Sequence, residues 1–396
     1  MLPGPMNSPV RIFLVAVEPS GDALGAELIT ALRSACGNDV EIAGVGGYNM
    51  EALGLKSAID ISGLAILGLL DGLKSYGTIL KRVNKTVDAA IKFGADAVVL
   101  IDSWGFMIRV AQRLQKQDNP PLLVKYVGPQ IWAARPKRAN VLAHSVDHLL
   151  TIHAFDAPMF EAAGLPTTFI GNPALERLVT GDGAAFRARH GIAPDAAVIG
   201  VLFGSRQSER HRIGPILRDA IALLAKKNPD AVFISPLAPA IAAGVAADIA
   251  SDERLPDIIQ VMEDEKRDAT SAMTVALAVS GTATTELALA GVPAVATYRL
   301  GWLSWFIYRF ILFKAKYFSL VNISADEELI IEHAQTDANG ETLAASVTAL
   351  LSEIKDGKSR GPALHHAALT MKGDGQSSAR AAKAVINLIT ARRDRD

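Results

Sequence analysis

Cysteine is nearly absent from this sequence, and its scarcity excludes two kinds of stabilising chemistry. Cys36 is the single cysteine among 396 residues, so neither an internal disulfide nor a thiolate metal cluster can form. A lone cysteine most simply serves as a small apolar side chain. Such use is typical of proteins in a reducing compartment, which favours the cytoplasm. The carboxylates and histidines show no ligand-like spacing, so the sequence predicts no metal site.

An excess of either charge is also missing, and so are long apolar runs. Lys and Arg number 40 against 41 Asp and Glu, giving a net charge of −1. No nucleic-acid partner is therefore predicted, and any basic surface must be local. No uncharged apolar run approaches the ~20 residues that span a bilayer. Residues 1–9 contain no charged segment followed by a long apolar one, which is the order typical of a secretory signal.

The sequence does contain a repeated alternation of apolar strand-like runs with helical patterns. Half of its residues are hydrophobic, and 396 residues exceed the usual range of one core. Such βαβ order predicts an α/β fold of two doubly wound, Rossmann-like domains with parallel sheets. The predicted strands are Val10–Val17, Glu41–Val45, Ala95–Ile101, Leu122–Val127, His148–Ile152, Thr168–Ile170, Val198–Phe203, Ala231–Ser235, Ile258–Val261, Thr274–Ser280 and Val292–Thr297.

Glycine and proline mark the expected domain boundary between residues 171 and 194. We predict a first domain over residues 1–180 and a second over 181–370. A C-terminal helical segment over 371–396 is expected to pack back toward the first domain. Loops at the carboxyl ends of both sheets are expected to face a central cleft.

The stretch from Ser280 to Pro293 predicts a phosphate site. An apolar strand ends at small residues, and a helix starts near Thr284. The first backbone N–H groups of such a helix have no partner within it and lie at the positive end of its dipole, which suits a diphosphate. Glu286 could accept hydrogen bonds from ribose hydroxyls. The alternative is an ordinary turn in which Ser280 or Thr282 caps the helix.

Two loops of the first half carry candidate carboxylates. Glu18 ends the first strand and could bind sugar hydroxyls or orient a base, whereas Ser20 or Asp22 could simply cap a helix from about Asp22 to Ser34. Asp102 follows a nearly all-apolar strand, where partial desolvation suits a general base. Asp102 could equally cap the next helix, and both roles are compatible.

Two glycine-containing loops could bring backbone close to a ligand. Gly46 and Gly47 follow the second strand, although a tight turn explains them as well. Gly204 and Ser205 follow the first strand of the second half, and Arg206 can form paired hydrogen bonds with phosphate oxygens. Arg206 could instead be a surface residue paired with Glu209.

Together these motifs resemble the lipid-A-disaccharide synthase family. The resemblance covers roughly residues 10 to 390, and the run from Ser280 to Pro293 is its most specific part. The motifs that carry it are Glu18-Pro19-Ser20-Gly21-Asp22, Gly44-Val45-Gly46-Gly47, Ile101-Asp102-Ser103, Gln130-Ile131-Trp132-Ala133, Gly204-Ser205-Arg206-Gln207-Ser208-Glu209, Ser280 to Pro293, and Lys316-Tyr317-Phe318-Ser319-Leu320-Val321-Asn322.

The resemblance implies an inverting, metal-independent GT-B glycosyltransferase of lipid A biosynthesis. Its implied substrates are UDP-2,3-diacylglucosamine and 2,3-diacylglucosamine 1-phosphate (lipid X), and its products are the β-1',6-linked disaccharide 1-phosphate and UDP. The UDP-sugar is a substrate, so no cofactor is implied. The first domain would hold mainly the acceptor and the second mainly the UDP-sugar. A homodimer is an open alternative to a monomer.

The resemblance also implies residue roles. The implied catalytic residues are Asp102 and Glu18. The implied acceptor-side residues are Ser20, Asp22, Gly46, Gly47 and Trp132. The implied UDP-sugar residues are Gly204, Ser205, Arg206, Ser280, Gly281, Thr282, Ala283, Thr284, Glu286 and Asn322.

Two segments combine apolar and basic residues and could lie on the anionic inner face of the cytoplasmic membrane, as a peripheral protein would. For both, a core helix with a solvated end is the alternative. The first runs from Ile61 through a basic stretch, and the second is the aromatic run from Leu300 to Phe313. The residues predicted to contact the membrane are Leu67, Leu70, Lys81, Arg82, Lys85, Trp302 and Trp305.

The sequence departs from the family pattern near the expected acceptor side. Six residues differ from those usual in the family: Val17, Trp104, Gly105, Met107, Ala134 and Asn172. These departures keep a divergent member with another acceptor open. A different GT-B enzyme such as a UDP-sugar 2-epimerase, and a non-catalytic paralogue that binds UDP-sugar, are further alternatives.

Overall fold

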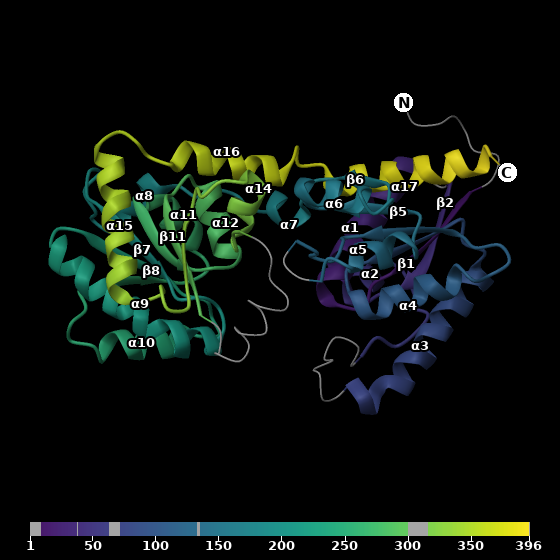
Figure 1. Cartoon of the computed structure of the whole chain (residues 1–396), viewed down its shortest axis with the longest axis horizontal. Coiled ribbons are helices and arrows are strands. Elements are labelled where there is room, and N and C mark those ends of the chain that lie inside the picture. Colours follow the sequence, from purple (N-terminus) through teal and green to yellow (C-terminus); the bar gives the residue numbers. More distant parts are fainter. Residues whose placement is uncertain (1–8, 38, 63–71, 133–134, 300–315, 396) are drawn as a thin grey trace. The chain divides into compact units, whose positions relative to one another are not determined.

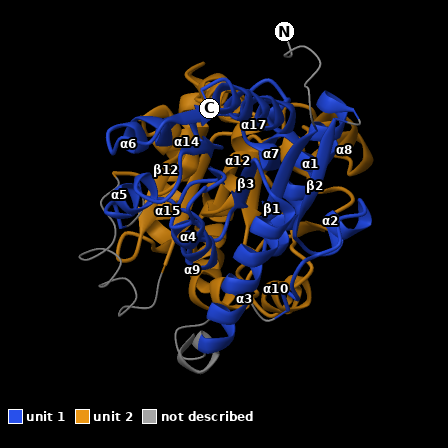
Figure 2. Ribbon diagram, turned by 90° about the vertical axis from the view of Figure 1, so that its right-hand side faces the viewer, with its two compact units in different colours: residues 1–176, 373–396 blue, residues 177–372 orange. Residues whose placement is uncertain are grey.

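A computed structural model describes residues 9–37, 39–62, 72–132, 135–299 and 316–395, with side chains omitted for 72–76. The chain divides into two compact units (Figure 2). Unit 1 comprises residues 1–176 and 373–396, and unit 2 comprises residues 177–372. The second unit thus begins at Arg177, four residues before the boundary expected from the sequence. The C-terminal segment groups with unit 1.

Unit 1 is built on a six-stranded parallel sheet (Figure 1). Its order is β2-β1-β3-β4-β5-β6, so the direction of winding changes between β1 and β3. In open α/β sheets, ligands bind at the carboxyl ends of the strands beside such a switch point. The strands are β1 (Val10–Val15), β2 (Val40–Val45), β3 (Ala97–Ile101), β4 (Leu122–Tyr126), β5 (His148–Thr151) and β6 (Thr167–Phe169).

Helices cover both faces of this sheet because successive strand residues point to opposite sides. Val98 and Leu100 of β3 pack with helices α3 and α4, whereas Val99 and Ile101 pack with α1 and α17. The helices are α1 (Pro19–Cys36), α2 (Tyr48–Ala52), α3 (Gly72–Phe93), α4 (Trp104–Leu114), α5 (Arg138–Ala143), η1 (Ala154–Asp156), α6 (Ala157–Glu161), α7 (Pro173–Glu176) and α17 (Ser377–Arg393).

The last helix, α17, completes the core of unit 1 from the far end of the chain. Val385 and Ile386 are buried against Leu28 and Ile29 of α1. Each such side chain contributes about 1.5–3 kcal/mol by leaving water. Polar contacts fix both ends of the helix. The Ser377 amide donates to Glu176 at 2.9 Å, and Arg393 pairs with Asp96 at 2.8 Å.

Unit 2 repeats the architecture with a different strand order, β12-β11-β10-β7-β8-β9. Its switch point therefore lies between β7 and β10. The strands are β7 (Val198–Leu202), β8 (Val232–Pro236), β9 (Ile258–Val261), β10 (Val275–Val279), β11 (Ala294–Tyr298) and β12 (Ile331–Ala334). The helices are α8 (Gly183–Arg189), α9 (Gln207–Lys227), α10 (Ala242–Ala250), α11 (Lys266–Ala272), α12 (Thr282–Leu289), α14 (Leu320–Ala325), α15 (Gly340–Lys355) and α16 (Gly361–Lys372).

The eleven predicted strands are confirmed to within about two residues at either end. The twelfth, β12, was not predicted, because Glu332 and His333 interrupt its short apolar run. Helix α1 begins at Pro19, three residues earlier than predicted. Proline suits that first position because its missing N–H would have no partner there.

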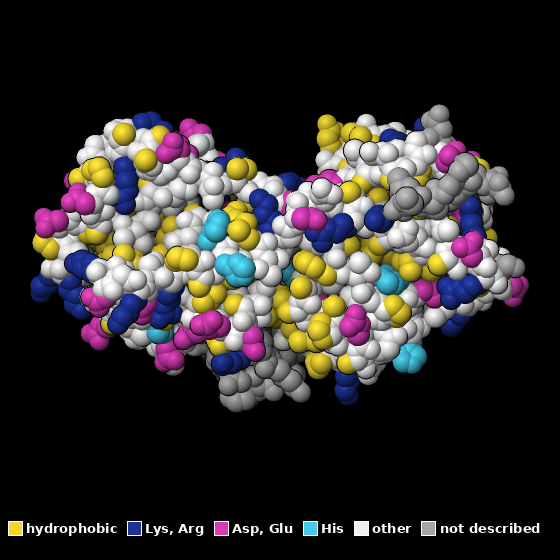
Figure 3. All heavy atoms as spheres, turned by 90° about the horizontal axis from the view of Figure 1, so that it is seen from above, with side chains coloured by type: hydrophobic (Ala, Val, Ile, Leu, Met, Phe, Trp, Pro, Cys, Tyr) yellow, Lys and Arg dark blue, Asp and Glu magenta, His cyan; other side chains and the backbone are white. Residues whose placement is uncertain are grey.

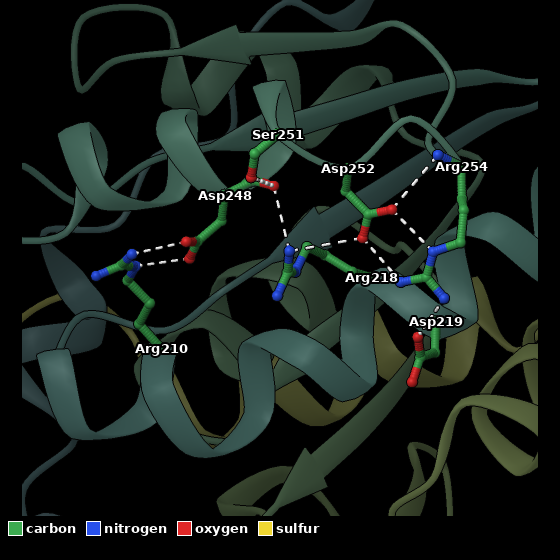
Figure 4. Close-up of polar contacts among 7 residues, drawn as sticks. All are labelled: Arg210, Arg218, Asp219, Asp248, Ser251, Asp252 and Arg254. Carbon is green, nitrogen blue, oxygen red and sulfur yellow. Dashed lines mark hydrogen bonds and ion pairs between the residues drawn. The ribbon is translucent and has the colours of Figure 1, made fainter.

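A network of ion pairs ties α10 to α9 on the surface of unit 2 (Figure 4). Arg210 holds Asp248 through two hydrogen bonds of 2.8 Å. Arg254 pairs with Asp252 and Asp219, and its hydrogen bonds hold the pKa of Asp252 at about 2. Exposed ion pairs of this kind contribute little stability singly. These pairs join α9, whose N-terminus borders the β7 switch point, to α10 and to the segment that follows α10.

Charge is mixed on the surface as it is in the sequence. Figure 3 shows lysine and arginine side chains interspersed with aspartate and glutamate on the face that it displays. Within the described part of the chain, no helix combines the length and apolar character needed to cross a membrane.

Candidate active site

A cavity lies at the switch point of unit 2, where sequence reasoning expected the diphosphate. Its volume is about 900 Å³, including solvent at its mouth. The loops after β7 and β10 form most of its wall. The residues that line it are Leu202, Gly204, Ser205, Arg206, Glu209, Pro236, Leu237, Ala238, Glu263, Lys266, Val279, Ser280, Gly281, Thr282 and Ala283.

Helix α12 presents its N-terminus to this cavity. Gly281 is its N-cap residue, and no side chain caps the helix. The structure thus lacks the cap by Ser280 or Thr282 that was the alternative. A Cβ added at Gly281 would meet no atom within 4 Å, so the backbone borders open space. The Thr284 amide donates to the Gly281 carbonyl at 3.2 Å. The amides of Thr282 and Ala283 precede it in the first turn, where an α-helix offers no acceptor, and can serve an anion.

Thr284 shapes the start of α12. The residue is 1% exposed, and its hydroxyl donates to the Gly281 carbonyl at 2.7 Å. The hydroxyl therefore closes the turn that borders the cavity, and the predicted contact of this residue with the UDP-sugar stays a prediction.

The loop after β7 is built around Glu209. This carboxylate accepts hydrogen bonds from the amides of Ser205 at 2.9 Å and Arg206 at 3.1 Å, and it pairs with the Arg206 guanidinium at 2.9 Å. Gly204 has φ +86, and a Cβ there would lie 2.5 Å from the Glu209 carboxylate, so glycine is required. Arg206 pairs with Glu209, as the alternative expected, and its 73% exposed side chain also lines the cavity. Its contact with phosphate oxygens stays a prediction.

Glu286 lies one helical turn further along α12. Its carboxylate pairs with Lys266 at 2.9 Å. Lys266 lines both the cavity above and an adjacent one of about 490 Å³ that Glu286 also lines. Sequence reasoning missed Lys266. Its place at the start of α11, directly after the loop that follows β9, was the available signal, since segments at the carboxyl ends of strands gather at the ligand site.

The switch point of unit 1 brings two predicted residues together. The Ser20 hydroxyl, after β1, donates to the Asp102 carboxylate, after β3, at 2.8 Å. Asp102 and Ser103 have φ values of 53 and 27, which are costly for residues with a Cβ. Helix α4 begins at Trp104 with Ser103 as its N-cap residue, so Asp102 does not cap it. Half-buried Glu18 precedes α1 at the same end of the sheet.

Comparison with known proteins shows the family to which the chain belongs. A model of the lipid-A-disaccharide synthetase family matches residues 12–387. The chain belongs to this family. The lipid-A-disaccharide synthase of Rhodospirillum centenum is 43% identical to it over 97% of this chain and 96% of that protein. The lipid-A-disaccharide synthase of Paramagnetospirillum magneticum is 41% identical over 86% and 88%.

Solved structures with the same fold confirm the predicted GT-B class. UDP-GlcNAc 2-epimerase from Neisseria meningitidis, bound to UDP-GlcNAc, is similar with a TM-score of 0.55 and 13% identity over 96% of this chain and 100% of that chain. Sucrose-phosphate synthase from Thermosynechococcus elongatus has a TM-score of 0.56 and 14% identity over the same shares. At such identities the likeness concerns the fold alone. As a member of the synthetase family, the chain is a glycosyltransferase of lipid A biosynthesis that uses a UDP-sugar donor.

Asn322, which matches a motif of the family, is not among the residues that line the unit 2 cavity. Its side chain is fully buried. The amide nitrogen donates to Ile330 at 2.7 Å and to Glu332 at 2.9 Å, and the amide oxygen accepts from the Ile330 amide at 2.9 Å. These hydrogen bonds join α14 to the start of β12, and the nucleotide contact of Asn322 stays a prediction.

Asp22 has an internal role as well. It is 3% exposed, and it accepts hydrogen bonds from the amides of Gly47, Asn49 and Met50 and from the Asn49 side chain at 2.7–3.2 Å. These four donors fill the acceptor capacity of the carboxylate, so its hydrogen bonds are internal, and its predicted contact with the acceptor stays a prediction. A Cβ at Gly46 would lie 2.6 Å from the Met50 sulfur, so close packing accounts for that glycine.

Trp132 is half-buried in an aromatic group of unit 1. Its ring meets Phe155 edge-on at 5.7 Å, and Phe155 stacks on His153 at 5.1 Å. Burial lowers the pKa of His153 to about 4, which leaves that ring neutral. The Trp132 indole N–H is buried and has no hydrogen-bond partner among the described residues. A polar group of a ligand could satisfy it.

The predicted membrane residues are only partly described. Lys81 and Lys85 are exposed on α3. Arg82 donates to the Ser62 carbonyl at 2.6 Å and pairs with Asp60 at 3.3 Å, so it holds the segment from Asp60 to Ser62, and its membrane contact stays a prediction. Leu67, Leu70, Trp302 and Trp305 lie outside the described residues.

No group of three or more His, Cys, Asp or Glu among the described residues could hold a metal ion.

Proposed function

We propose that this member of the synthetase family transfers 2,3-diacylglucosamine from UDP-2,3-diacylglucosamine to the 6-hydroxyl of lipid X. The products are the β-1',6-linked disaccharide 1-phosphate and UDP. Binding of the UDP-sugar donor is supported by the unit 2 cavity at the β7 and β10 switch point, where an arginine and a helix N-terminus converge. The identity of the acceptor is supported by the family alone.

The reaction inverts the anomeric centre, so one direct displacement suffices. Asp102 takes the proton of the acceptor hydroxyl as its oxygen forms a bond to the donor C1. The bond from C1 to the UDP oxygen breaks, and the diphosphate leaves with the electron pair. Arg206 and the first amides of α12 stabilise the negative charge that develops there.

Two further carboxylates have assigned roles. Glu286 accepts hydrogen bonds from the ribose, and Lys266, 2.9 Å from it, orients that carboxylate. Glu18 orients the acceptor hydroxyl groups beside Asp102. Trp132 lies on the acceptor side of the same unit.

Purified protein with UDP-diacylglucosamine and lipid X in detergent tests this proposal. We expect equal amounts of disaccharide and UDP. UDP binding without disaccharide would overturn it and favour a non-catalytic paralogue. Release of UDP with a free 2-epimer of the sugar would favour an epimerase. Turnover of the donor with another acceptor alone would favour a divergent transferase.

We further propose that Lys81 and Lys85 contact the anionic inner surface of the cytoplasmic membrane. Each exposed lysine near such a surface contributes about 1 kcal/mol. The double change Lys81→Ala and Lys85→Ala should therefore weaken binding to vesicles with phosphatidylglycerol by roughly 10 to 30-fold at low salt, measured by co-sedimentation, with a smaller effect at high salt.

The matched control replaces Lys226 and Lys227, an equally exposed pair at the end of α9, by alanine. It should bind vesicles as the unmodified protein does. Equal loss in both double variants would point to net charge alone and would count against an α3 contact.

A further inference from the structure

A buried lysine lies beneath the proposed base. Lys125 is the fourth of five residues in β4, and its other strand residues are apolar or aromatic. Its side chain is 3% exposed. Removing an ammonium group from water is expensive, so a lysine is retained in such a place only when its surroundings satisfy it. The proposed mechanism gives this lysine no role.

The ammonium group of Lys125 links the ends of two neighbouring strands. It donates to the carbonyl oxygens of Leu100 at 3.2 Å, Tyr126 at 3.4 Å and Asp102. A protonated lysine has three N–H donors, and these three carbonyls use all of them. Two acceptors belong to the end of β3 and its loop, and one belongs to β4.

The loop that Lys125 holds is the strained one. Asp102 and Ser103 both have positive φ, and such backbone costs of order 1–3 kcal/mol per residue and persists only when surrounding contacts enforce it. The Asp102 amide donates to the Tyr126 carbonyl at 2.9 Å, so Asp102 is held from both its N–H and its C=O. That backbone orientation places its carboxylate against Ser20.

The electrostatic setting agrees with this geometry. Burial lowers the pKa of Lys125 to about 7, and the negative charges of Asp102 and Glu18 act in the opposite direction. These two carboxylates end β3 and β1, the strands on either side of the switch point. One cation thus lies below the pair of proposed catalytic carboxylates.

We propose that Lys125 is a positioning residue that holds the strained backbone of Asp102 so that its carboxylate faces the acceptor hydroxyl. It acts through the Asp102 carbonyl and does not touch substrate, because its three donors are all used internally. The catalytic part of this inference rests on the proposed function, in which Asp102 is the base.

Lys125→Met tests the inference, since methionine keeps the length of the side chain and removes its donors and charge. We expect kcat to fall by 10²-fold or more, with UDP affinity unchanged because the donor cavity is in unit 2. In an Asp102→Asn background the same change should cost less than about 3-fold, because a residue that acts through Asp102 has nothing left to position. If kcat of the double variant falls by the product of the two single-variant factors, the inference is overturned.

Hydrogen exchange tests the contact without the reaction. The peptide across residues 98–106 should exchange faster in Lys125→Met than in the unmodified protein, whereas the β10 peptide across 275–279 should not change. Unchanged exchange at 98–106 overturns the inference whether or not disaccharide forms. If the unmodified protein makes no disaccharide, the proposed function fails while this measurement still decides the contact. Lys125→Gln replaces the methionine variant if the latter does not fold.

Discussion

Asp102→Asn is expected to lower kcat by about 10³-fold, within the range that general bases contribute. The amide has the size of the carboxylate and can still accept the hydrogen bond that Ser20 donates at 2.8 Å. It cannot take the proton of the acceptor hydroxyl. The affinity for UDP should stay within about 2-fold, since the donor cavity belongs to unit 2. Steady-state turnover with both lipid substrates and UDP titration by calorimetry measure the two effects.

The matched control is Asp96→Asn at the opposite end of the same strand. Asp96 pairs with Arg393 at 2.8 Å and has no contact with Ser20 or the switch-point loops. Its replacement should lower the melting temperature slightly and leave turnover within a few-fold of normal. Near-normal turnover in Asp102→Asn would reject Asp102 as the base and leave Glu18 as the carboxylate to test next.

Gly281→Val is expected to weaken UDP binding by 100-fold or more with little change in stability. The backbone of Gly281 is extended, with φ 164, so a β-branched residue can adopt it. A Cβ there meets no protein atom within 4 Å, so the new side chain enters the cavity and not the core. It would occupy the space in front of the α12 amides that the diphosphate needs. Calorimetric titration with UDP and thermal unfolding measure the two quantities.

Gly214→Ala in α9 is the control for adding a methyl group in the same unit. Its Cβ would make an ordinary contact of 3.9 Å with Arg210. Alanine is favoured over glycine inside a helix by roughly 0.5–1 kcal/mol. UDP affinity should therefore be unchanged and stability equal or higher. Tight UDP binding by Gly281→Val would show that the diphosphate lies elsewhere.

The positions of strands and of the loops that follow them could be predicted from the sequence, because a run of apolar residues indicates a buried strand. A continuous run such as Val275–Val279 is buried on both faces, which identifies a central parallel strand and the loop that must follow it. Gly204, Gly281 and Asp102 were located in this way. The strand β12 was not predicted because Glu332 lies within it. That carboxylate is half-buried because it accepts hydrogen bonds from the amides of Phe318 and Ser319, which are distant in the sequence.

The direction of a side chain could not be predicted in the same way. Asp22 and Asn322 stand in the correct loops, yet each turns inward to satisfy backbone groups of a neighbouring segment. Nothing in the local sequence distinguishes a carboxylate that binds a sugar from one that binds three amides. Lys125 is the opposite case. A charged residue inside an apolar strand can be recognised from the sequence, but its hydrogen-bond partners are set by the neighbouring strand.

The return of α17 to unit 1 has a consequence for the order of folding during synthesis. The face of α1 that carries Leu28 and Ile29 lacks its cover until residues 377–393 leave the ribosome. Residues 177–372 are complete before that point. Domains of multidomain chains generally fold from the N-terminus onward. Here unit 2, although translated second, is the first that can fold to completion, and a ribosome that stops at residue 372 releases a chain whose N-terminal half still exposes apolar surface.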